Sequence, residues 1–287
     1  MRAARYPAEL TPATLAEIYR SASDRELFDQ LVRCDRCSVA YLSPRIRADL
    51  IVSAYADAVD PTFFEQNPMR IRTFDRSLRW LERQLALDPR ATRVLDVGCA
   101  GGAFPAAAKQ RGYAATGVEP SRWLASQARD GYGVDVRAGT LAEQRFPESS
   151  FDLVTLWDVL EHLTDPSAAI TEVRRVLRPG GHLVVSYPDL SGVVARAMGW
   201  RWPFFLSVHL TYFDRATIRR FLDERGFDVL AIRPLWQTLE WGYVLQRASL
   251  CARPVGPLHR LVRALGLGHL PFTYHLSQFL VLARSRP

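Results

Sequence analysis

The stretch Val94-Leu95-Asp96-Val97-Gly98-Cys99-Ala100-Gly101-Gly102 decides the expected fold of this chain. It begins with the apolar pattern of a buried strand and ends in a loop in which three of five residues are glycine. A helical pattern follows at 104–111. Glycine allows tight turns and lets the backbone approach a ligand without an intervening side chain. The stretch therefore predicts the first strand–loop–helix unit of a ligand-binding α/β domain.

Strand and helix patterns alternate from this unit to about residue 188. Strands separated by helices of this length form parallel βαβ units. The fold class we expect is α/β, with a seven-stranded, doubly wound, mostly parallel sheet. Its last strand should run antiparallel near the preceding one. The expected strands are 93–97, 114–119, 134–138, 151–157, 182–187, 227–232 and 277–284, and the expected helices are 71–85, 104–111, 121–130, 166–177 and 214–225.

The remaining segments divide the chain into an extension and a main domain. Residues 1–68 form the expected N-terminal extension, and residues 69–287 the main domain. Within the main domain, 189–213 is expected to be a lid over the sheet edge. Residues 236–270 are expected to be an insertion with one short amphipathic helix at 258–265.

Two carboxylates restrict the class of ligand. Glu119 ends the second expected strand, 23 residues after Asp96, where a carboxylate can accept both hydroxyl protons of a ribose. A dinucleotide-binding loop is the alternative, but its pattern is Gly-x-Gly-x-x-Gly, and Asp96 would add negative charge beside a pyrophosphate. A ligand with an ammonium group and no phosphate suits Asp96 better. S-adenosylmethionine is such a ligand, since it carries an amino-acid head, a sulfonium, a ribose and an adenine.

Four motifs together resemble the class I S-adenosylmethionine-dependent methyltransferases, which have a Rossmann-like fold. The resemblance covers about residues 90 to 190, and the order and spacing of the motifs make it specific. The motifs are Asp96 to Gly102, Gly117 to Ser121, Phe151 to Val154 with Asp158 to His162, and Leu177 to Gly181. The resemblance implies that S-adenosylmethionine is the cofactor.

The resemblance also implies roles for individual residues. Asp96 and the loop residues Gly98, Cys99, Ala100 and Gly101 would hold the methionine end, and Glu119 the ribose. Pro120, Thr140 and Leu141 would lie against the adenine. Trp157, at the end of the fourth expected strand, would lie beside the reacting centre, with plain core packing as the alternative.

Two histidines are candidate bases for a hydroxyl acceptor. His162 follows the fourth expected strand at the carboxyl edge of the sheet, and His209 lies in the lid over that edge. The alternative for His162 is packing against the cofactor, and carbon or amine acceptors need no strong base. His182 begins a strand at the opposite edge and is expected to be structural.

A pair of cysteines, Cys34 and Cys37, lies in the extension. Together with residues 40–45 it resembles the second half of a zinc-binding head found in relatives such as sugar C-methyltransferases. A structural zinc ion needs four ligands, and no cysteine or histidine precedes Cys34. We therefore expect a degenerate zinc-knuckle-like segment without metal.

The lid is unusually aromatic, with Trp200, Trp202, Phe204 and Phe205 within six residues. We expect residues 198–212 to form the acceptor side of the site. Shallow contact with a membrane surface would also account for these side chains. A lid packed on its own domain is the alternative.

Composition limits the partners. The formal net charge is +7, but 36 of the 37 basic residues are arginine, and no basic run alternates with aromatics as in a nucleic-acid groove. No run of 18 apolar residues predicts a membrane span, and the start lacks a secretory pattern, so a cytoplasmic protein is expected. The expected function is methyl transfer to a small-molecule, glycan or lipid-linked acceptor, with oxygen favoured. C- or N-methylation of a sugar or secondary metabolite, and a non-catalytic binding module, are the alternatives.

Overall fold

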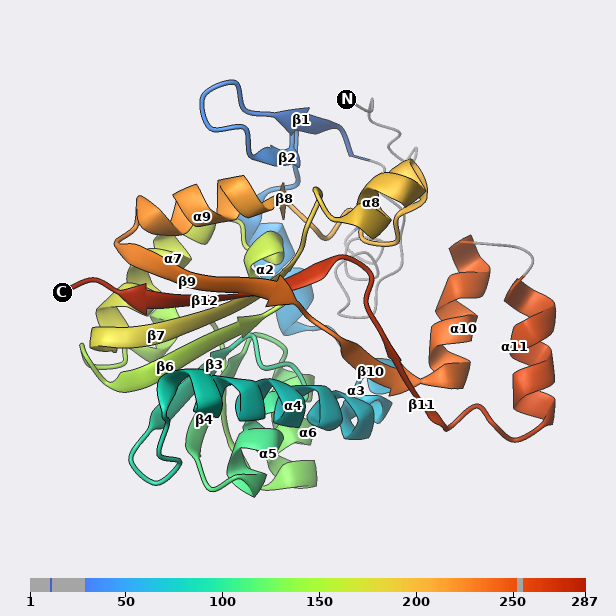
Figure 1. Cartoon of the computed structure of the whole chain (residues 1–287), viewed down its shortest axis with the longest axis horizontal. Coiled ribbons are helices and arrows are strands. Elements are labelled where there is room, and N and C mark those ends of the chain that lie inside the picture. Colours follow the sequence, from blue (N-terminus) through green and yellow to red (C-terminus); the bar gives the residue numbers. More distant parts are fainter. Residues whose placement is uncertain (1–10, 12–28, 252–254) are drawn as a thin grey trace.

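A seven-stranded sheet with the order β5-β4-β3-β6-β7-β12-β9 forms the centre of the molecule (Figure 1). The computed structural model describes residues 11, 29–251 and 255–287. β12 is antiparallel to both of its neighbours, and the other neighbouring pairs are parallel. This confirms the expected α/β fold, including the antiparallel last strand. The strands are β3 (Arg93–Val97), β4 (Ala114–Glu119), β5 (Asp135–Ala138), β6 (Phe151–Trp157), β7 (Leu177–Pro188), β9 (Phe227–Pro234) and β12 (Gln278–Ser285).

Helices cover both faces of the sheet, because alternate side chains of each central strand point to opposite faces. On β12, Phe279 and Val281 join the apolar cluster under α7 (Pro166–Val176) and α9 (Arg215–Asp223). Leu280 and Leu282 join the cluster under α4 (Asn67–Leu85) and α5 (Ala103–Gln110). α6 (Arg122–Tyr132) packs beside α5 through small residues, and Figure 1 shows α4, α5 and α6 together on one side.

Several helices begin at a side chain that accepts a backbone N–H of the first turn, which stabilises a helix start by about 1 kcal/mol. Ser121 does so for α6, as its place in the sequence predicts, by accepting from the N–H of Leu124. Asp214 starts α9 in a capping box with Thr217. These caps fix where the helices begin relative to the strands before them.

The N-terminal extension and the lid share one small sheet. β1 (Leu31–Arg33) and β2 (Ala40–Leu42) form a hairpin, and β2 also pairs with β8 (Thr211–Tyr212) from the lid. The lid further contains α8 (Val193–Met198) and the single turn η3 (Gly199–Arg201). Cys34 and Cys37 lie in the β1–β2 turn, where the N–H of Ser38 donates to the carbonyl of Cys34. A hairpin turn of this kind does not by itself make a zinc site.

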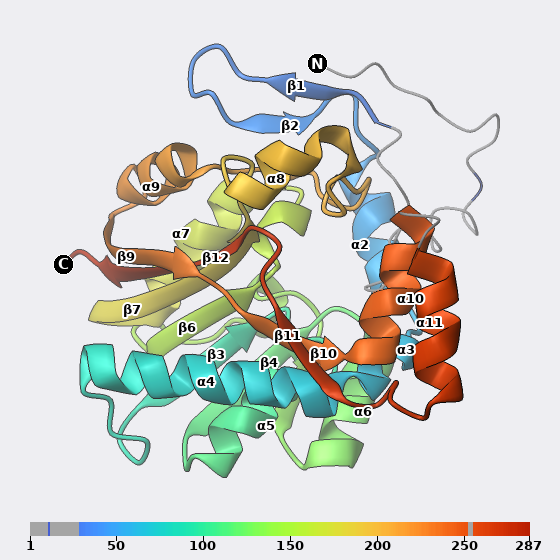
Figure 2. The same cartoon turned by 45° about the vertical axis from the view of Figure 1, so that its right-hand side comes forward.

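The insertion contains more secondary structure than its sequence predicts. β10 (Gln237–Glu240) pairs antiparallel with β11 (Pro271–Tyr274), and two helices, α10 (Trp241–Cys251) and α11 (Val255–Ala264), lie between these strands. The helix expected at 258–265 corresponds to α11, whereas the expectation of a single helix in this segment was wrong. The sequence of α10 has only a weak amphipathic period, so its pattern does not reveal a helix. Figure 2 shows α10 and α11 side by side, beyond the end of the β10–β11 ladder.

Two boundaries also differ from expectation. β7 begins at Leu177 instead of residue 182, because Leu177 already pairs with Phe151. The ladder is irregular after this pair, and it continues where Leu153 pairs with His182. α4 begins four residues before the expected position 71, at Asn67-Pro68, where proline is compatible with the first turn of a helix. No described helix meets the length and hydropathy that a membrane span requires.

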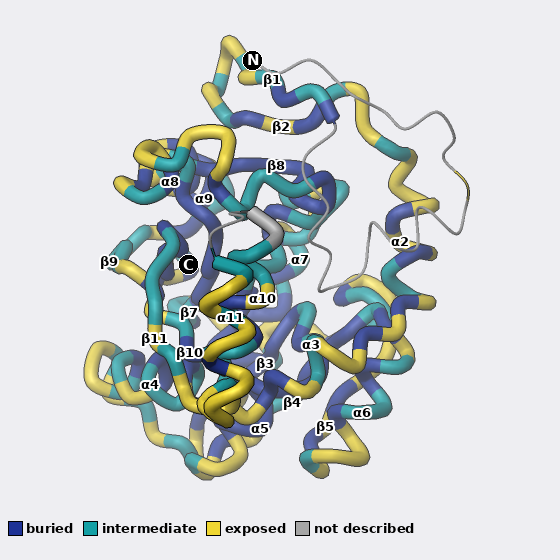
Figure 3. The backbone as a smooth tube through the Cα atoms, turned by 90° about the vertical axis from the view of Figure 1, so that its right-hand side faces the viewer, coloured by how far each residue is buried: buried dark blue, intermediate teal, exposed yellow. Residues whose placement is uncertain are grey.

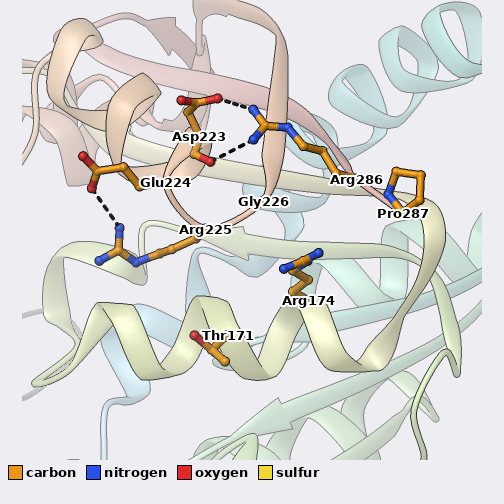
Figure 4. A pocket seen from close by; sticks show the side chains of 8 residues that line it. All are labelled: Thr171, Arg174, Asp223, Glu224, Arg225, Gly226, Arg286 and Pro287. Atoms are coloured by element: carbon orange, nitrogen blue, oxygen red, sulfur yellow. Dashed lines mark hydrogen bonds and ion pairs between the residues drawn. The ribbon is translucent and has the colours of Figure 1, made fainter.

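A surface hollow lies at the amino edge of the sheet (Figure 4). Its ion pairs join Arg286 to Asp223 and Arg225 to Glu224. Arg284, two residues before Arg286, pairs with His182 at the start of the parallel part of β7. Because ligands of open α/β sheets bind at the carboxyl edge, this hollow is not a candidate for the cofactor site.

Candidate active site

The strand order reverses between β3 and β6, and ligands of open α/β sheets bind in the crevice outside the carboxyl ends of the strands at such a point. Asp96 lies in β3 at this point and is 1% exposed. Its Oδ1 accepts a hydrogen bond of 2.6 Å from the hydroxyl of Thr155 on β6. Burial raises the pKa of Asp96 well above its usual range, and the nearby Glu119 adds to the effect. A cationic ligand would favour the ionised carboxylate here.

The loop after β3 owes its shape to left-handed backbone positions. Gly98 has φ +69° and Gly102, which precedes α5, has φ +77°. A Cβ on Gly98 would come within 2.6 Å of the Val159 side chain, so the loop packs directly on the turn after β6. Ala100 is left-handed as well, with φ +47°. This unfavourable position for a side-chain residue is compensated by a hydrogen bond from its N–H to Glu119 Oε2 at 2.8 Å.

Glu119 ties the glycine loop to the end of β4. Besides the bond to Ala100, its Oε1 accepts from the N–H of Ser121 at 2.8 Å. Each oxygen of a carboxylate can accept two hydrogen bonds, so each retains a site for a ribose hydroxyl. Burial raises the pKa of Glu119 to about 7. Asp96 and Glu119 thus form a pair of buried acids that fits a cofactor with a cationic end and a ribose.

The helix α3 (Pro61–Glu65) covers the glycine loop. A Cβ on Gly101 would come within 2.6 Å of the Phe64 ring and 2.7 Å of Asn67 Nδ2. That Nδ2 group donates to the Gly101 carbonyl at 2.7 Å, and Asn67 is fully buried. Sequence reasoning missed Phe64 and Asn67, because no local pattern shows that a segment some 35 residues earlier folds over the loop.

The expected adenine side lies next to Glu119. The N–H of Gly139, after β5, donates to the Glu119 carbonyl at 2.9 Å, which brings the following residues to the same edge. Leu141 is buried, whereas the N–H and hydroxyl of Thr140 both donate to Glu143. Pro120 directly follows Glu119. Cys99 is buried, close to Gly117 of β4, so its side chain faces the sheet.

Trp157 ends β6 but packs into the core. Its ring centroid lies 5.0 Å from that of Phe74 and 5.3 Å from that of Phe104. Its indole N–H is buried and has no partner among the residues that the structure describes. These contacts favour the alternative of core packing for Trp157. Because its indole N–H has no partner, we keep a hydrogen bond from this group to a bound molecule as a proposal.

The residue after Trp157 is the centre of a polar network that sequence reasoning missed. Asp158 has the left-handed φ of +52° and accepts from the Ser186 hydroxyl at 2.7 Å. Its Oδ2 accepts from the amides of Gln237 at 3.1 Å and Gln278 at 2.7 Å. Strained backbone of this kind concentrates at functional sites. Asp158 lies in the fourth-strand motif, but its partners come from the insertion and the last strand.

The two candidate bases lie together. The rings of His162 and His209 meet edge to face, with centroids 4.7 Å apart. Nδ1 of His162 lies 2.9 Å from the Tyr55 hydroxyl, and Nδ1 of His209 lies 2.8 Å from the Phe204 carbonyl. The latter distance requires an Nδ1–H on His209 and leaves its Nε2 as an acceptor. Burial lowers the pKa of His162 to about 4 and that of His209 well below its usual value. Both rings are therefore neutral near pH 7.

Glu161 completes this cluster. It is 1% exposed, and neither carboxylate oxygen has a hydrogen-bond partner in the described part of the chain. Burial raises its pKa well above the usual range, with a further contribution from Asp158. One ligand atom each from Glu161, His162 and His209 lies within 4.8 Å of the others, a grouping that could hold a metal ion. The sequence predicts no metal site here.

The aromatic lid packs mainly on itself. Trp202 is 1% exposed, and its indole N–H donates to the Leu276 carbonyl at 3.0 Å. Its ring contacts those of Phe204 and Phe205. Trp200 is the exception, at 50% exposed. Burial of Trp202 supports the packed-lid alternative and not a contact of this ring with the acceptor.

The doubly wound sheet, the glycine loop and the buried acids Asp96 and Glu119 define a Rossmann-like methyltransferase. Comparison with known families agrees: residues 69–232, more than half of the chain, match the methyltransferase domain family. The chain belongs to this family, and its cofactor is S-adenosylmethionine. The cradle formed by Gly98 and Gly101, into which a Cβ would not fit, and the two acids suit that cofactor.

Curated relatives carry one repeated name. A ubiquinone biosynthesis O-methyltransferase of Pseudomonas aeruginosa is 35% identical over 127 residues, which are 42% of this chain and 50% of the relative. Its namesake in Idiomarina loihiensis is 32% identical over 174 residues, 55% of this chain and 70% of the relative. The chain thus spans half the length of the first of these proteins.

Solved structures share the fold. A methyltransferase of Thermotoga maritima, described as a possible histamine N-methyltransferase, has a TM-score of 0.52 and 19% identity, covering 78% of this chain and 94% of its own. An S-adenosylmethionine-dependent methyltransferase of Archaeoglobus fulgidus has a TM-score of 0.53 and 17% identity, covering 79% and 100%. Such similarity extends to the architecture alone.

Proposed function

We propose that this chain methylates a hydroxyl oxygen of a small molecule with S-adenosylmethionine as the donor. The observation that carries the proposal is the similarity to curated O-methyltransferases at 35% identity over 127 residues. C- or N-methylation of a sugar or secondary metabolite is the alternative that the sequence leaves open, and no specific contact favours it. When bound, S-adenosylmethionine supplies an electrophilic methyl group, so the chain must hold the cofactor, align the acceptor and accept a proton.

Residues at the carboxyl edge of the sheet are suited to holding the cofactor and aligning the acceptor. Asp96 would hold the ammonium end, and Glu119 the ribose hydroxyls. The acceptor would lie at the carboxyl end of β6, beside Asp158, because this strand adjoins β3 at the crevice. Proper alignment of two reactants can supply much of the rate enhancement.

The cluster of His162 and His209 would accept the acceptor's proton. Their depressed pKa values keep both rings neutral but also make them weak bases. An acidic hydroxyl such as a phenol therefore fits better than an alkyl alcohol. The positive charge that a proton brings to either ring would favour ionisation of Glu161, which lies beside both rings and whose pKa is otherwise raised by burial.

The test is an assay of S-adenosylhomocysteine formation with a panel of phenols, catechols, alcohols and amines. The proposal expects turnover with phenolic acceptors, and the carbon shift of the new methyl group in the NMR spectrum must be that of a methyl ether. Turnover confined to amines, or a methyl group bound to carbon, would contradict it. Asp96→Asn serves as the control that removes cofactor binding.

A further inference from the structure

The helical hairpin α10–α11 exposes an unusual apolar surface. Leu258 and Leu261 lie three residues apart on α11 (Val255–Ala264) and are 44% and 55% exposed. Leu265 directly follows the helix, where its N–H donates to the Leu261 carbonyl at 3.0 Å, and is 62% exposed. Leu267 and Leu270, in the segment that returns to β11, are 41% and 42% exposed. Figure 3 shows this part of the hairpin among the exposed segments of the chain. We name these five leucines the leucine face.

The hairpin stands beyond the body of the domain. Among the described elements, α11 packs mainly on α10, and α10 touches the β10–β11 ladder (Figure 1). Two hydrogen bonds hold the base of the hairpin. The N–H of Trp241 donates to the Leu270 carbonyl at 2.9 Å, and the N–H of Gly242 donates to the Gly268 carbonyl at 2.8 Å. A Cβ on Gly242 would lie 3.1 Å from the Gly268 backbone. The leucine face is thus presented on a fixed support.

The segment that forms the hairpin carries charge of one sign. Residues 241–270 contain four arginines and no aspartate or glutamate. Arg260 and Arg263 lie on α11 itself and are exposed next to the leucines. A helix with exposed leucines and flanking arginines has the composition of one that lies in the interface of an anionic membrane. A protein partner would have to supply both an apolar groove and a matching acidic rim.

We propose that the α10–α11 hairpin docks the protein on an anionic lipid surface, with the leucine face in contact with the acyl boundary. The long side chains of Arg260 and Arg263 would reach the phosphate groups while their stems cover apolar surface. This surface is distinct from the aromatic lid, in which Trp202 is buried.

Docking would orient the active site towards the membrane. The β10–β11 ladder carries the hairpin and also supplies Gln237, whose amide donates to Asp158 at 3.1 Å. The ladder is fixed to α4, because the N–H of Thr238 donates to the Thr73 hydroxyl at 2.7 Å. The hairpin therefore adjoins the expected acceptor side of the crevice. This inference about the acceptor rests on the proposed function. A methyl acceptor linked to a lipid is the class that fits an active site held at a membrane.

The test is flotation of the full chain with vesicles of phosphatidylcholine, with and without phosphatidylglycerol. We expect binding to the anionic vesicles only, weakened by added salt. Leu261→Ser with Leu265→Ser should lower the bound fraction at least tenfold. Arg260→Gln combined with Arg263→Gln should weaken binding to the anionic vesicles and should make the remaining binding less sensitive to salt. Leu230→Ser with Leu50→Ser, at positions 51% and 40% exposed, is the matched control and should bind like the wild type.

Two outcomes would overturn the proposal. One is the absence of vesicle binding by a chain that still binds S-adenosylmethionine in calorimetry. The other is a dimer in light scattering that the leucine substitutions dissociate, which would assign the leucine face to a second copy. Because vesicle binding requires no methyl transfer, failure of the proposed function would instead appear as lost turnover with intact flotation.

Discussion

The Glu119 carboxylate accepts the N–H of Ala100 at 2.8 Å, so the acid expected to bind ribose also holds the glycine loop in its left-handed shape. One side chain therefore connects the end of β4 with the loop after β3. Substitution of Glu119 removes a ligand contact and loosens the loop at the same time. A change that keeps the hydrogen-bond acceptor separates the two roles, because a glutamine carbonyl can still accept from one N–H.

Glu119→Gln should stabilise the ligand-free protein at high pH. Burial raises the pKa of Glu119 to about 7. The contribution of its protonated form to folding stability is therefore fully present below the unfolded pKa of 4.5 and is lost as the pH rises through 7. At about pH 8 the free energy of unfolding of the variant should exceed that of the wild type by on the order of 2 kcal/mol. At about pH 4 the two free energies should be close. Urea unfolding at both pH values measures this. Equal gains at both would show that the charge on Glu119 is not responsible.

Gly101→Ala should disturb the cover of the cofactor loop. The new Cβ would lie 2.6 Å from the Phe64 ring, so α3 must shift, at a cost of about 1–3 kcal/mol. Gly256→Ala is the control, because no atom lies within 4 Å of its Cβ position. Thermal unfolding and calorimetry with S-adenosylmethionine should both show a loss for Gly101→Ala. If Gly101→Ala changed neither the thermal stability nor the affinity for S-adenosylmethionine, α3 would not be packed tightly against the loop.

Trp202→Ala should affect folding and not the acceptor. The ring is 1% exposed, and replacing such a side chain costs about 3–5 kcal/mol. Trp200→Ala, at a ring 50% exposed, should change stability by less than about 0.5 kcal/mol. Denaturant unfolding of both variants checks the difference. If Trp202→Ala unfolds like the wild type but raises the acceptor KM, the packed-lid interpretation fails.

His209→Ala should lower kcat roughly a hundredfold with little change in cofactor affinity, since the ring is proposed to accept a proton. The loss should shrink at high pH, where a phenolic acceptor ionises without a base. Because both rings are neutral near pH 7, the wild-type rate should show no inflection at the usual histidine pKa. His182→Ala, at the opposite edge, is the control. A loss of equal size for His182→Ala would point to a general structural effect.

Much of the cofactor side follows from local pattern. Asp96, the glycine loop and Glu119 lie at the ends of neighbouring strands, and apolar runs with their loops predict those ends. The seven-stranded, mostly parallel sheet is likewise predicted by the alternation of strands and helices. The sheet brings these residues together without help from distant parts of the chain, so sequence reasoning is sufficient there.

The acceptor side could not be predicted in this way. Asp158 takes its partners from Gln237 and Gln278, about 80 and 120 positions later, and His162 meets Tyr55, which lies 107 positions earlier. Such contacts depend on how the insertion, lid and extension fold back, which no local period reveals. Trp202 has the composition of a ligand-binding residue, yet tertiary packing buries it.

Calorimetric titration with S-adenosylmethionine, on the wild type and on Glu119→Ala, tests the central claim most directly. We expect one binding site per chain, and at least tenfold weaker binding in the variant, because hydrogen bonds to a charged group contribute about 1.5–3 kcal/mol each. Circular dichroism must show that the variant is folded. No binding by the wild type, or unchanged affinity in a folded Glu119→Ala protein, would contradict the assignment of this crevice to the cofactor.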